Sequence, residues 1–401
     1  MEKPEVKPAV CEVGQGTLPG CAALAFPYIP MQSNNPTRYS RTEALQTGTL
    51  FPGLNLNLTM QLVNVAMALG AAAAMAVLGR TIFEDSRISR ACVAAGLLVW
   101  PALLFCQQVY GTIPMLFFVS LAMLCYAKYV KTRRRALGAA FACLLALAYA
   151  AKINAAVALI AVTICSVLDA LENRKLEPLA YAALAIALSL LLLRAIIWQY
   201  ERRSGVTLNS GIGALARLTM GMQEGGGAAG WFNRYTEQFF PLEVTARQQH
   251  DIALADLKAR LAEMAQNPAQ TAAFFREKFC SQWMEPTMGM LWNGALSEHT
   301  GAFGETAARF FAKDHTVLET LLGAFQRALY AFSAAGIIGM LRDRKRSGLC
   351  LLLPLIFFGG ALYHLLFEAK SQYAFPYAVL LLPVAAMGIC RIEDGLKGKR
   401  A

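Results

Sequence analysis

The sequence contains few charged residues. Only 16% of its 401 residues are Asp, Glu, Lys or Arg, whereas 56% are hydrophobic and the mean hydropathy is +0.43. Soluble domains carry about 25% charged residues, so this composition predicts an integral membrane protein. The net charge of +11 does not indicate a nucleic-acid partner, because the basic residues lie in short stretches between apolar runs and form no basic-aromatic motif.

The sequence also lacks the motifs of several common sites. None of its ten cysteines forms a C-x-x-C pair, and its four histidines show no metal-ligand spacing. A P-loop with GK[ST] and a G-x-S-x-G nucleophile elbow are both absent. We therefore predict no metal site and no resident cofactor, although a divalent cation held by carboxylates stays open.

Long apolar runs dominate what remains. A membrane helix needs about 20 apolar residues, and the chain offers nine candidate runs with a tight turn at Lys152–Asn154 between the fourth and the fifth. The predicted fold is all-α, a polytopic bundle of about nine transmembrane helices with an external helical segment. The runs are 58–79, 91–107, 112–130, 136–151, 153–169, 179–198, 317–341, 349–366 and 373–390.

Basic loops alternate with loops poor in Lys and Arg along the chain. Because basic loops face the cytoplasm, we expect loops 107–111 and 368–372 on the outer side of a cell membrane. The predicted regions are an external N-terminal region 1–57, spans 58–198, an extracytoplasmic and mostly helical segment 199–316, spans 317–390, and a basic cytoplasmic tail 391–401. The external region 1–57 has no signal peptide. This favours a missing earlier span over a translocated tail.

The external segment 199–316 combines a glycine-rich stretch with an aromatic one. "GMQEGGGAAGWFNRY" precedes an amphipathic helix over 254–264 that we expect to end at Asn267–Pro268. Phe274, Phe279 and Trp283 follow, and they predict either a helix lying on the membrane surface or the core of a small helical cap. In both interpretations the segment can roof a cavity that opens at the outer leaflet.

Ionisable residues next to apolar runs are candidates for function. The stretch "FEAKSQYAFPY" places Glu368 and Lys370 between the last two runs, and Lys152 lies at another outer turn. Arg327 falls in the middle of the run 317–341, where a charge needs a partner or water.

Four segments carry a resemblance to a known family. They are "YIPMQSNN" (28–35), "MGMQEGGGAAGWFNRY" (220–235), "KFCSQWMEPT" (278–287) and "FEAKSQYAFPYAVLLLP" (367–383). On these the chain resembles the polytopic GT-C glycosyltransferases, in particular bacterial relatives of the protein mannosyltransferases. The resemblance implies an enzyme that moves a sugar from a polyprenyl-phosphate donor in the lipid bilayer to an acceptor on the outer face. It does not identify that acceptor.

The resemblance also implies roles for single residues. A cation near the headgroups would bind the donor phosphate, and Lys370, Lys152 and Arg327 are candidates. Members of the family use an acid of the first external loop as the base, and because residues 1–42 contain no Asp, Glu12 is its stand-in. The further substrate-binding candidates are Glu368 at the rim of the donor pocket, Tyr373 and Trp231 as aromatic faces, and Glu224 and Glu285 for sugar hydroxyls.

Two other functions stay open at this point. A transporter or flippase-like protein would use Arg327 and Glu319 to mark a path through the membrane. A structural membrane subunit would need no site at all. The chain shows no inverted repeat, which many transporters have.

Overall fold

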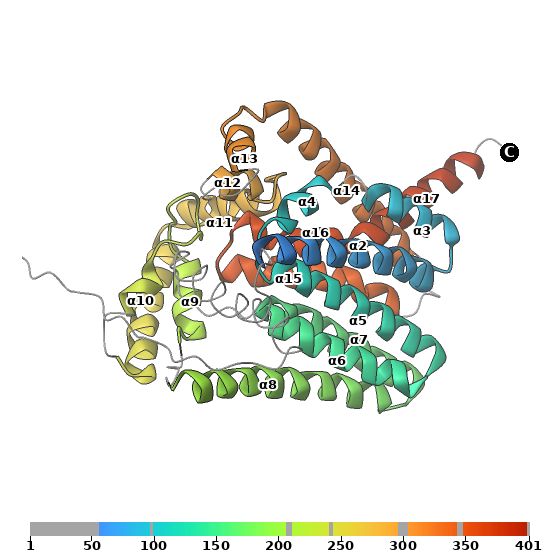
Figure 1. The fold of residues 1–401 in the computed structure, drawn as a ribbon, viewed down its shortest axis with the longest axis horizontal. Coiled ribbons are helices and arrows are strands. Elements are labelled where there is room, and N and C mark those ends of the chain that lie inside the picture. Colours follow the sequence, from blue (N-terminus) through green and yellow to red (C-terminus); the bar gives the residue numbers. More distant parts are fainter. Residues whose placement is uncertain are drawn as a thin grey trace, which may run out of the picture.

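The computed structural model describes residues 56–96, 99–205, 211–239, 244–295, 304–342 and 348–398, and these residues form helices and no strand (Figure 1). The helices of the bundle are α2 (Leu56–Phe83), α3 (Ser86–Gly96), α4 (Trp100–Cys106), α5 (Thr112–Thr132), α6 (Arg135–Ala151), α7 (Ala156–Asn173), α8 (Glu177–Ser204), α14 (Thr316–Arg342), α15 (Leu352–Leu366), α16 (Phe375–Leu380) and α17 (Leu382–Gly398). The predicted all-α bundle is thereby confirmed.

Six stretches of the described chain are long and apolar enough to cross a membrane, and a bent pair of helices would make a seventh. The expectation of about nine spans is not confirmed. The run 91–107 forms two short helices, α3 and α4, with Pro101 in the first turn of α4. α6 has only 17 residues. The last run bends by 51° between α16 and α17, where Pro383 has no N–H to continue the helical hydrogen bonds.

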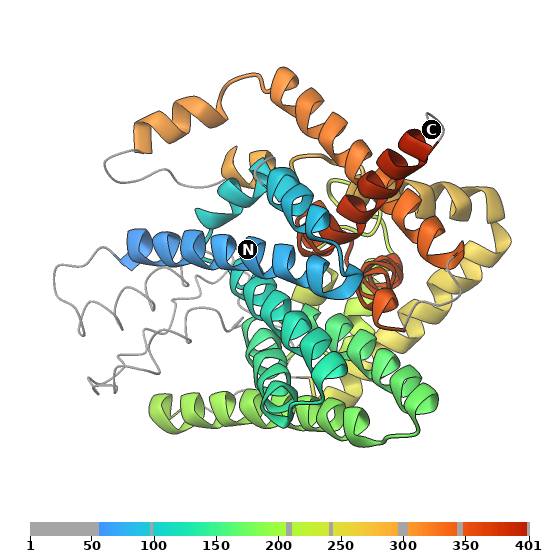
Figure 2. The ribbon, with the colours of Figure 1, turned by 90° about the vertical axis from the view of Figure 1, so that its right-hand side faces the viewer.

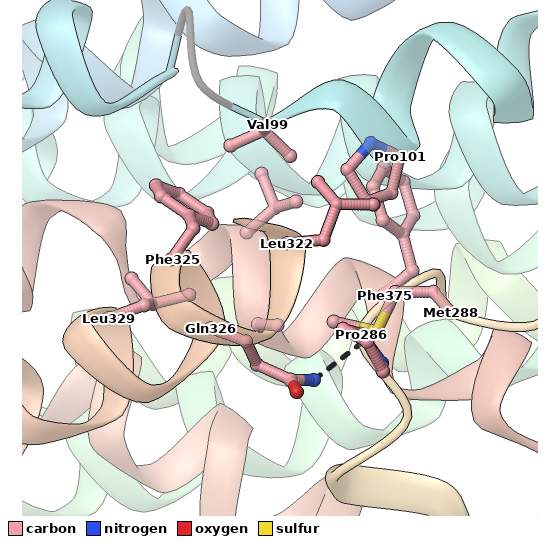
Figure 3. Close-up of a pocket in the computed structure, with 11 residues that line it drawn as sticks. Val99, Pro101, Pro286, Met288, Leu322, Phe325, Gln326, Leu329 and Phe375 are labelled. Atoms are coloured by element: carbon pink, nitrogen blue, oxygen red, sulfur yellow. Dashed lines mark hydrogen bonds between the residues drawn. The ribbon is translucent and has the colours of Figure 1, made fainter. Parts of the chain in front are cut away.

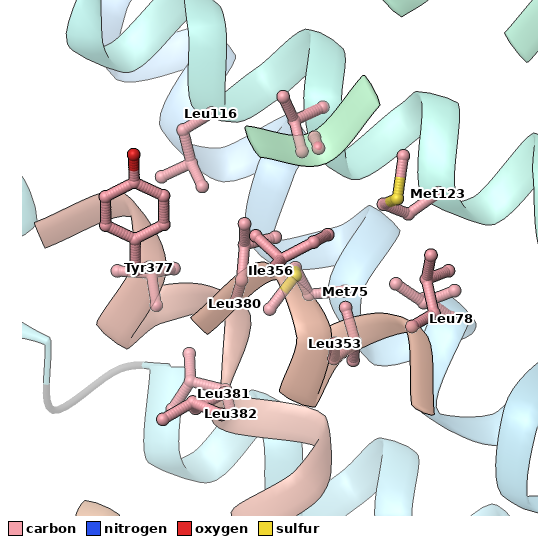
Figure 4. Close-up of a cluster of buried hydrophobic side chains, with 14 of the residues drawn as sticks. Met75, Leu78, Leu116, Met123, Leu353, Ile356, Tyr377, Leu380, Leu381 and Leu382 are labelled. Carbon is pink, nitrogen blue, oxygen red and sulfur yellow. The ribbon is translucent and has the colours of Figure 1, made fainter. Parts of the chain in front are cut away.

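The bundle packs around a core to which α2, α5, α15, α16 and α17 all contribute (Figure 4). Met75 of α2, Met123 of α5 and Leu352 of α15 are fully buried there. α8 packs on α6 and α7 at the edge of the bundle, and much of its apolar surface stays exposed. An exposed apolar surface of this kind is typical of a helix that faces lipid.

The C-terminal end of α17 faces the viewer in Figure 2. Charged side chains pair at this end of the bundle. The guanidinium of Arg87, in the first turn of α3, donates to both carboxylate oxygens of Asp394 of α17, at 2.6 and 2.9 Å. Arg133, just after α5, forms a two-pronged pair with Asp169 of α7, with both distances 2.6 Å. Basic loops predicted on one side of the membrane therefore meet at one end of the molecule.

The segment after α8 forms a small helical cap at the opposite end (Figure 1). We call residues 211–295 the cap, with helices α9 (Ala214–Gly221), α10 (Ala246–Gln266), α11 (Pro268–Trp283) and α12 (Met290–Ala295). α10 ends at Gln266 and α11 starts at Pro268, as the Asn267–Pro268 dipeptide predicts. A further helix, α13 (Gly304–Phe311), follows it.

The burial of two aromatic residues of α11 favours the core of a small helical cap over a helix that lies on the membrane surface. Phe274 is buried in a cap core with Met222, Leu257 and Met264. Trp283 is buried in the core of the bundle. Two of these aromatics thus anchor the cap, while Phe279 is 46% exposed.

Candidate functional site

Three loops meet where the cap covers the bundle. They are the loop 107–111 before α5, the turn at Lys152 between α6 and α7, and the loop 367–373 after α15. α2 holds the first loop, because the buried amide of Asn64 donates to the carbonyl oxygens of Cys106 and Gln108 at 3.1 and 3.0 Å. The charge pattern predicts two of these loops on the same side of the membrane, and here they are adjacent.

Lys152 occupies the centre of this convergence. α6 ends at Ala151, and Lys152 takes an extended backbone conformation that turns its side chain inward. The side chain is buried, and its ammonium donates to the Thr112 hydroxyl at 2.8 Å. The same ammonium lies 4.4 Å from the ring centroid of Tyr110 and 5.0 Å from that of Tyr373. Aromatic faces attract cations, so the two rings stabilise the ammonium of Lys152 at this turn.

The loop 367–373 is held in place by His364 of α15. Its Nδ1 lies 2.6 Å from the backbone oxygen of Glu368. A carbonyl oxygen can only accept, so Nδ1 carries the proton and donates it. The imidazole also stacks on the ring of Tyr373, with centroids 5.3 Å apart and an interplanar angle of 6°. His364 thereby fixes the segment that carries Glu368, Lys370 and Tyr373.

Lys370 points from this loop toward α12 of the cap. Its ammonium donates to Oδ1 of Asn293 at 2.8 Å and lies 4.1 Å from the ring centroid of Trp292. The Trp292 ring meets Trp231 edge to face at 6.0 Å. The indole N–H of Trp231 in turn donates to Ser281 at 3.2 Å. Lys370 and Trp231 are therefore linked through Trp292.

The cap adds a third lysine behind the same loop. Lys278 of α11 is 1% exposed, and its ammonium donates to the backbone oxygen of Gly221. Gly230 packs against the Lys278 side chain with φ at +72°, where a Cβ would lie 2.5 Å from Cε. The carbonyl of Gly230 accepts from the amide of Ala369 at 3.0 Å. Only glycine allows this close approach between the cap and the loop 367–373.

We call Lys152, Lys278 and Lys370 the lysine cluster. Burial lowers the pKa of Lys152 and of Lys278 to about 7 each, and that of Lys370 to about 8; the negative charge of Glu368 partly opposes this lowering at Lys152 and Lys370. Burial also raises the pKa of Glu368, against the Tyr373 hydroxyl and the nearby cations. An anion entering the cluster would favour the charged form of each lysine. The cluster is therefore suited to an anionic group.

A small apolar pocket lies between α4, α14 and α16 (Figure 3). Side chains of α4, α14 and α16 and of the loop 286–288 line it, among them Phe325, Met288 and Phe375. Gln326 is its one polar lining residue, and its amide approaches the backbone oxygen of Glu285 at 3.4 Å. Within the described residues, no group of three or more His, Cys, Asp or Glu side chains is placed to hold a metal ion.

The other candidate residues lie apart from the cluster or have structural contacts. Glu224 is exposed in a groove of the cap, 3.4 Å from Arg260. Glu285 accepts from the backbone amides of Thr287 and Gly289 and so holds its own turn. Arg327 is exposed on α14 beside Gly323, one turn back, and thus does not sit inside the bundle. Glu12 lies outside the described residues.

Several residues of the site were missed by sequence reasoning. The helical spacing of Phe274, Lys278 and Gln282 could have indicated Lys278, because residues four apart share a face and all three are buried. Trp292 and Asn293 gave no such signal, since neither stands in a charged or periodic pattern. Their role depends on a contact with Lys370, which lies 77 residues beyond Asn293.

Comparisons with known proteins cover little of the chain. A family model described as Spore coat associated protein JA (CotJA) matches residues 23–58, nearly all of them before the first described residue. No curated protein and no solved structure matches the chain. The match is too short to assign the chain to that family.

Proposed function

We propose that the chain is a membrane glycosyltransferase that takes a sugar from a polyprenyl-phosphate donor and transfers it to an acceptor at the outer face of the cytoplasmic membrane. The observation that carries this proposal is the lysine cluster. Three lysines and one glutamate, Glu368, surround the junction of the cap and the bundle. A net positive, largely buried site at the end of membrane helices suits the phosphate of a lipid.

The chemistry of transfer matches this arrangement. The oxygen of an acceptor hydroxyl attacks C1 of the sugar, and the bond between C1 and the phosphate oxygen breaks. The polyprenyl phosphate leaves with the electron pair of that bond, and a cation beside it stabilises the developing charge. The hydroxyl proton goes to a carboxylate base, for which Glu12 is the candidate.

The proposed sidedness follows from the charges at the two ends. Basic residues such as Lys131 and Arg133 gather at the end opposite the cap. Basic loops face the cytoplasm, so we place the cap and the lysine cluster outside. The test uses Glu224→Cys in the cap and Lys131→Cys at the basic end, with a membrane-impermeant maleimide on intact cells. The chain has ten cysteines of its own, so labelling is compared with that of the wild-type chain. We expect extra labelling of the first variant alone, and extra labelling of Lys131→Cys alone would reverse the orientation.

Activity is tested with the chain reconstituted in vesicles and a radiolabelled polyprenyl-phosphate hexose as donor. We expect transfer of label to an added membrane extract, and its loss in Lys370→Ala and Glu368→Gln. Lys397→Ala is the matched control, because this lysine is exposed, pairs with Glu393 and lies at the basic end. Full activity in both site variants would show that the site is wrong, and no transfer by the wild-type chain would contradict the proposed reaction.

The transporter alternative is weakened by the placement of its marker residues. Arg327 and Glu319 are both exposed on α14 and do not line an interior path. A membrane path for a charged substrate needs ionisable groups that face the bundle interior.

A further inference from the structure

The exposed ring of Trp292 is the feature that the phosphate site leaves unexplained. Trp292 is 51% exposed although it belongs to the short helix α12, which packs against α13 and α4. Lys370 lies over the ring, and Trp231 meets it edge to face. An aromatic ring that is held by two neighbours and is half exposed is a rigid apolar surface.

Two amide side chains, Asn293 and Gln372, lie next to this ring. Oδ1 of Asn293 accepts from Lys370 at 2.8 Å, and its Nδ2 donates to Oε1 of Gln372 at 2.8 Å. Amide side chains offer both donors and acceptors, which is what sugar hydroxyls require. Trp292 supplies an apolar face, and a pyranose ring has an apolar C–H face that packs on such surfaces. The ring and the amides beside it thus offer both kinds of contact that a sugar ring makes.

We propose that Trp292, Asn293 and Gln372 form the subsite for the hexopyranosyl ring of the donor. The inference rests on the proposed function, and it deepens it by assigning where the sugar lies. In a glycosyl phosphate the ring is joined to the phosphorus through a single oxygen. A phosphate bound by Lys370 therefore places the sugar within a few bond lengths of Trp292, whose ring centroid is 4.1 Å from that ammonium.

A membrane anchor is the other role that an exposed tryptophan commonly has, because tryptophan is enriched at bilayer surfaces. An anchor presents its ring to lipid. The ring of Trp292 instead has an ammonium over it and an amide network beside it. These polar neighbours favour a sugar over acyl chains.

The test compares two probes on the purified full chain by calorimetric titration: farnesyl phosphate and its mannosyl ester. Trp292→Ala removes the ring, and Trp292→Phe keeps an aromatic face. Trp198→Ala is the matched control, because Trp198 is 56% exposed and has Arg202 over its ring, at 5.3 Å from the centroid, on α8. Thermal unfolding of each variant checks that the fold is intact.

We expect Trp292→Ala to weaken binding of the mannosyl ester about tenfold, the equivalent of one aromatic contact, and to change binding of farnesyl phosphate less than twofold (about the error of such a titration). Trp292→Phe should restore part of the affinity, and Trp198→Ala should alter neither probe. Equal weakening of both probes, or of neither, overturns the sugar subsite while leaving the phosphate site standing. A wild-type chain that binds neither probe overturns the proposed function and the subsite together.

Discussion

Replacing Lys152 by methionine should separate two effects of its charge. One is the free-energy cost of burying the charge in the folded chain, and the other is its contribution to phosphate binding. The side chain is 6% exposed, so methionine of similar length fills the same space. Its ammonium has one hydroxyl partner, Thr112, and two aromatic rings, Tyr110 and Tyr373, against it. These contacts compensate a buried cation only in part, which is why its pKa falls to about 7.

Lys152→Met should leave the stability of the chain unchanged or raise it, and it should lower the affinity for phosphate. Replacing a buried charge by an apolar side chain of similar volume is neutral or stabilising, by up to about 4 kcal/mol. A hydrogen bond to a charged group contributes about 1.5–3 kcal/mol, so losing one from a bound phosphate should weaken binding about 10- to 150-fold. A residue that is only structural would not give a more stable chain with weaker binding.

The assay measures both quantities on the purified chain, with thermal unfolding for stability and calorimetric titration of farnesyl phosphate for affinity. Lys131→Met is the control, because Lys131 pairs with Glu84 at the basic end. It should leave phosphate affinity unchanged. An affinity of Lys152→Met within twofold of the wild-type value (within about 0.4 kcal/mol) would refute a phosphate contact at this lysine.

Three further results are expected. The pKa values of about 7 for Lys152 and about 8 for Lys370 lie below the ordinary value, so these lysines lose their charge as the pH rises from 6 to 9. The phosphate of the mannosyl ester keeps its single charge over this range, so the affinity for this ester should fall as the pH rises. The stability of the free chain should rise over the same range, because the unfolded state keeps the protons that the folded state loses. An affinity that does not change with pH would contradict this prediction. Asp169→Asn leaves a guanidinium without its carboxylate and should destabilise the chain by about 3 kcal/mol in thermal unfolding, and a loss under about 1 kcal/mol would show that the pair is dispensable. Gly230→Ala should lower both stability and phosphate affinity, because its φ is +72° and its Cβ would strike Lys278. Gly226→Ala should change neither, because its Cβ would come no closer than 4.0 Å to the backbone oxygen of Phe232; equal effects of the two substitutions would exclude the contact at Gly230.

Much of the site could be predicted because it depends on local sequence and charge pattern. Apolar runs and basic loops place Lys152 and the loop 368–372 at one end, and the structure brings them together. The number of spans was less predictable, since Pro101 and Pro383 break runs whose composition alone looks continuous. Hydropathy reports composition, and it does not report where a helix bends.

Side-chain direction explains the remaining differences. Arg327 falls in the middle of an apolar run, but its face of α14 is outward. Glu285 is an acid beside aromatics, but it turns back to the amides of Thr287 and Gly289. Lys278 stands in a helix of soluble composition, yet the cap buries it against Gly221. Each of these outcomes depends on tertiary packing between distant segments.

The most direct test of the lysine cluster is a cryo-electron microscopy structure of the chain with farnesyl-phosphoryl mannose bound. If these lysines bind the donor, the density of its phosphate should lie about 3 Å from the ammonium of Lys370 or Lys152, within charge-assisted hydrogen-bond distance. The sugar density should lie against Trp292. Phosphate density at the basic end, near Arg87 or Lys131, would contradict the assignment of this site.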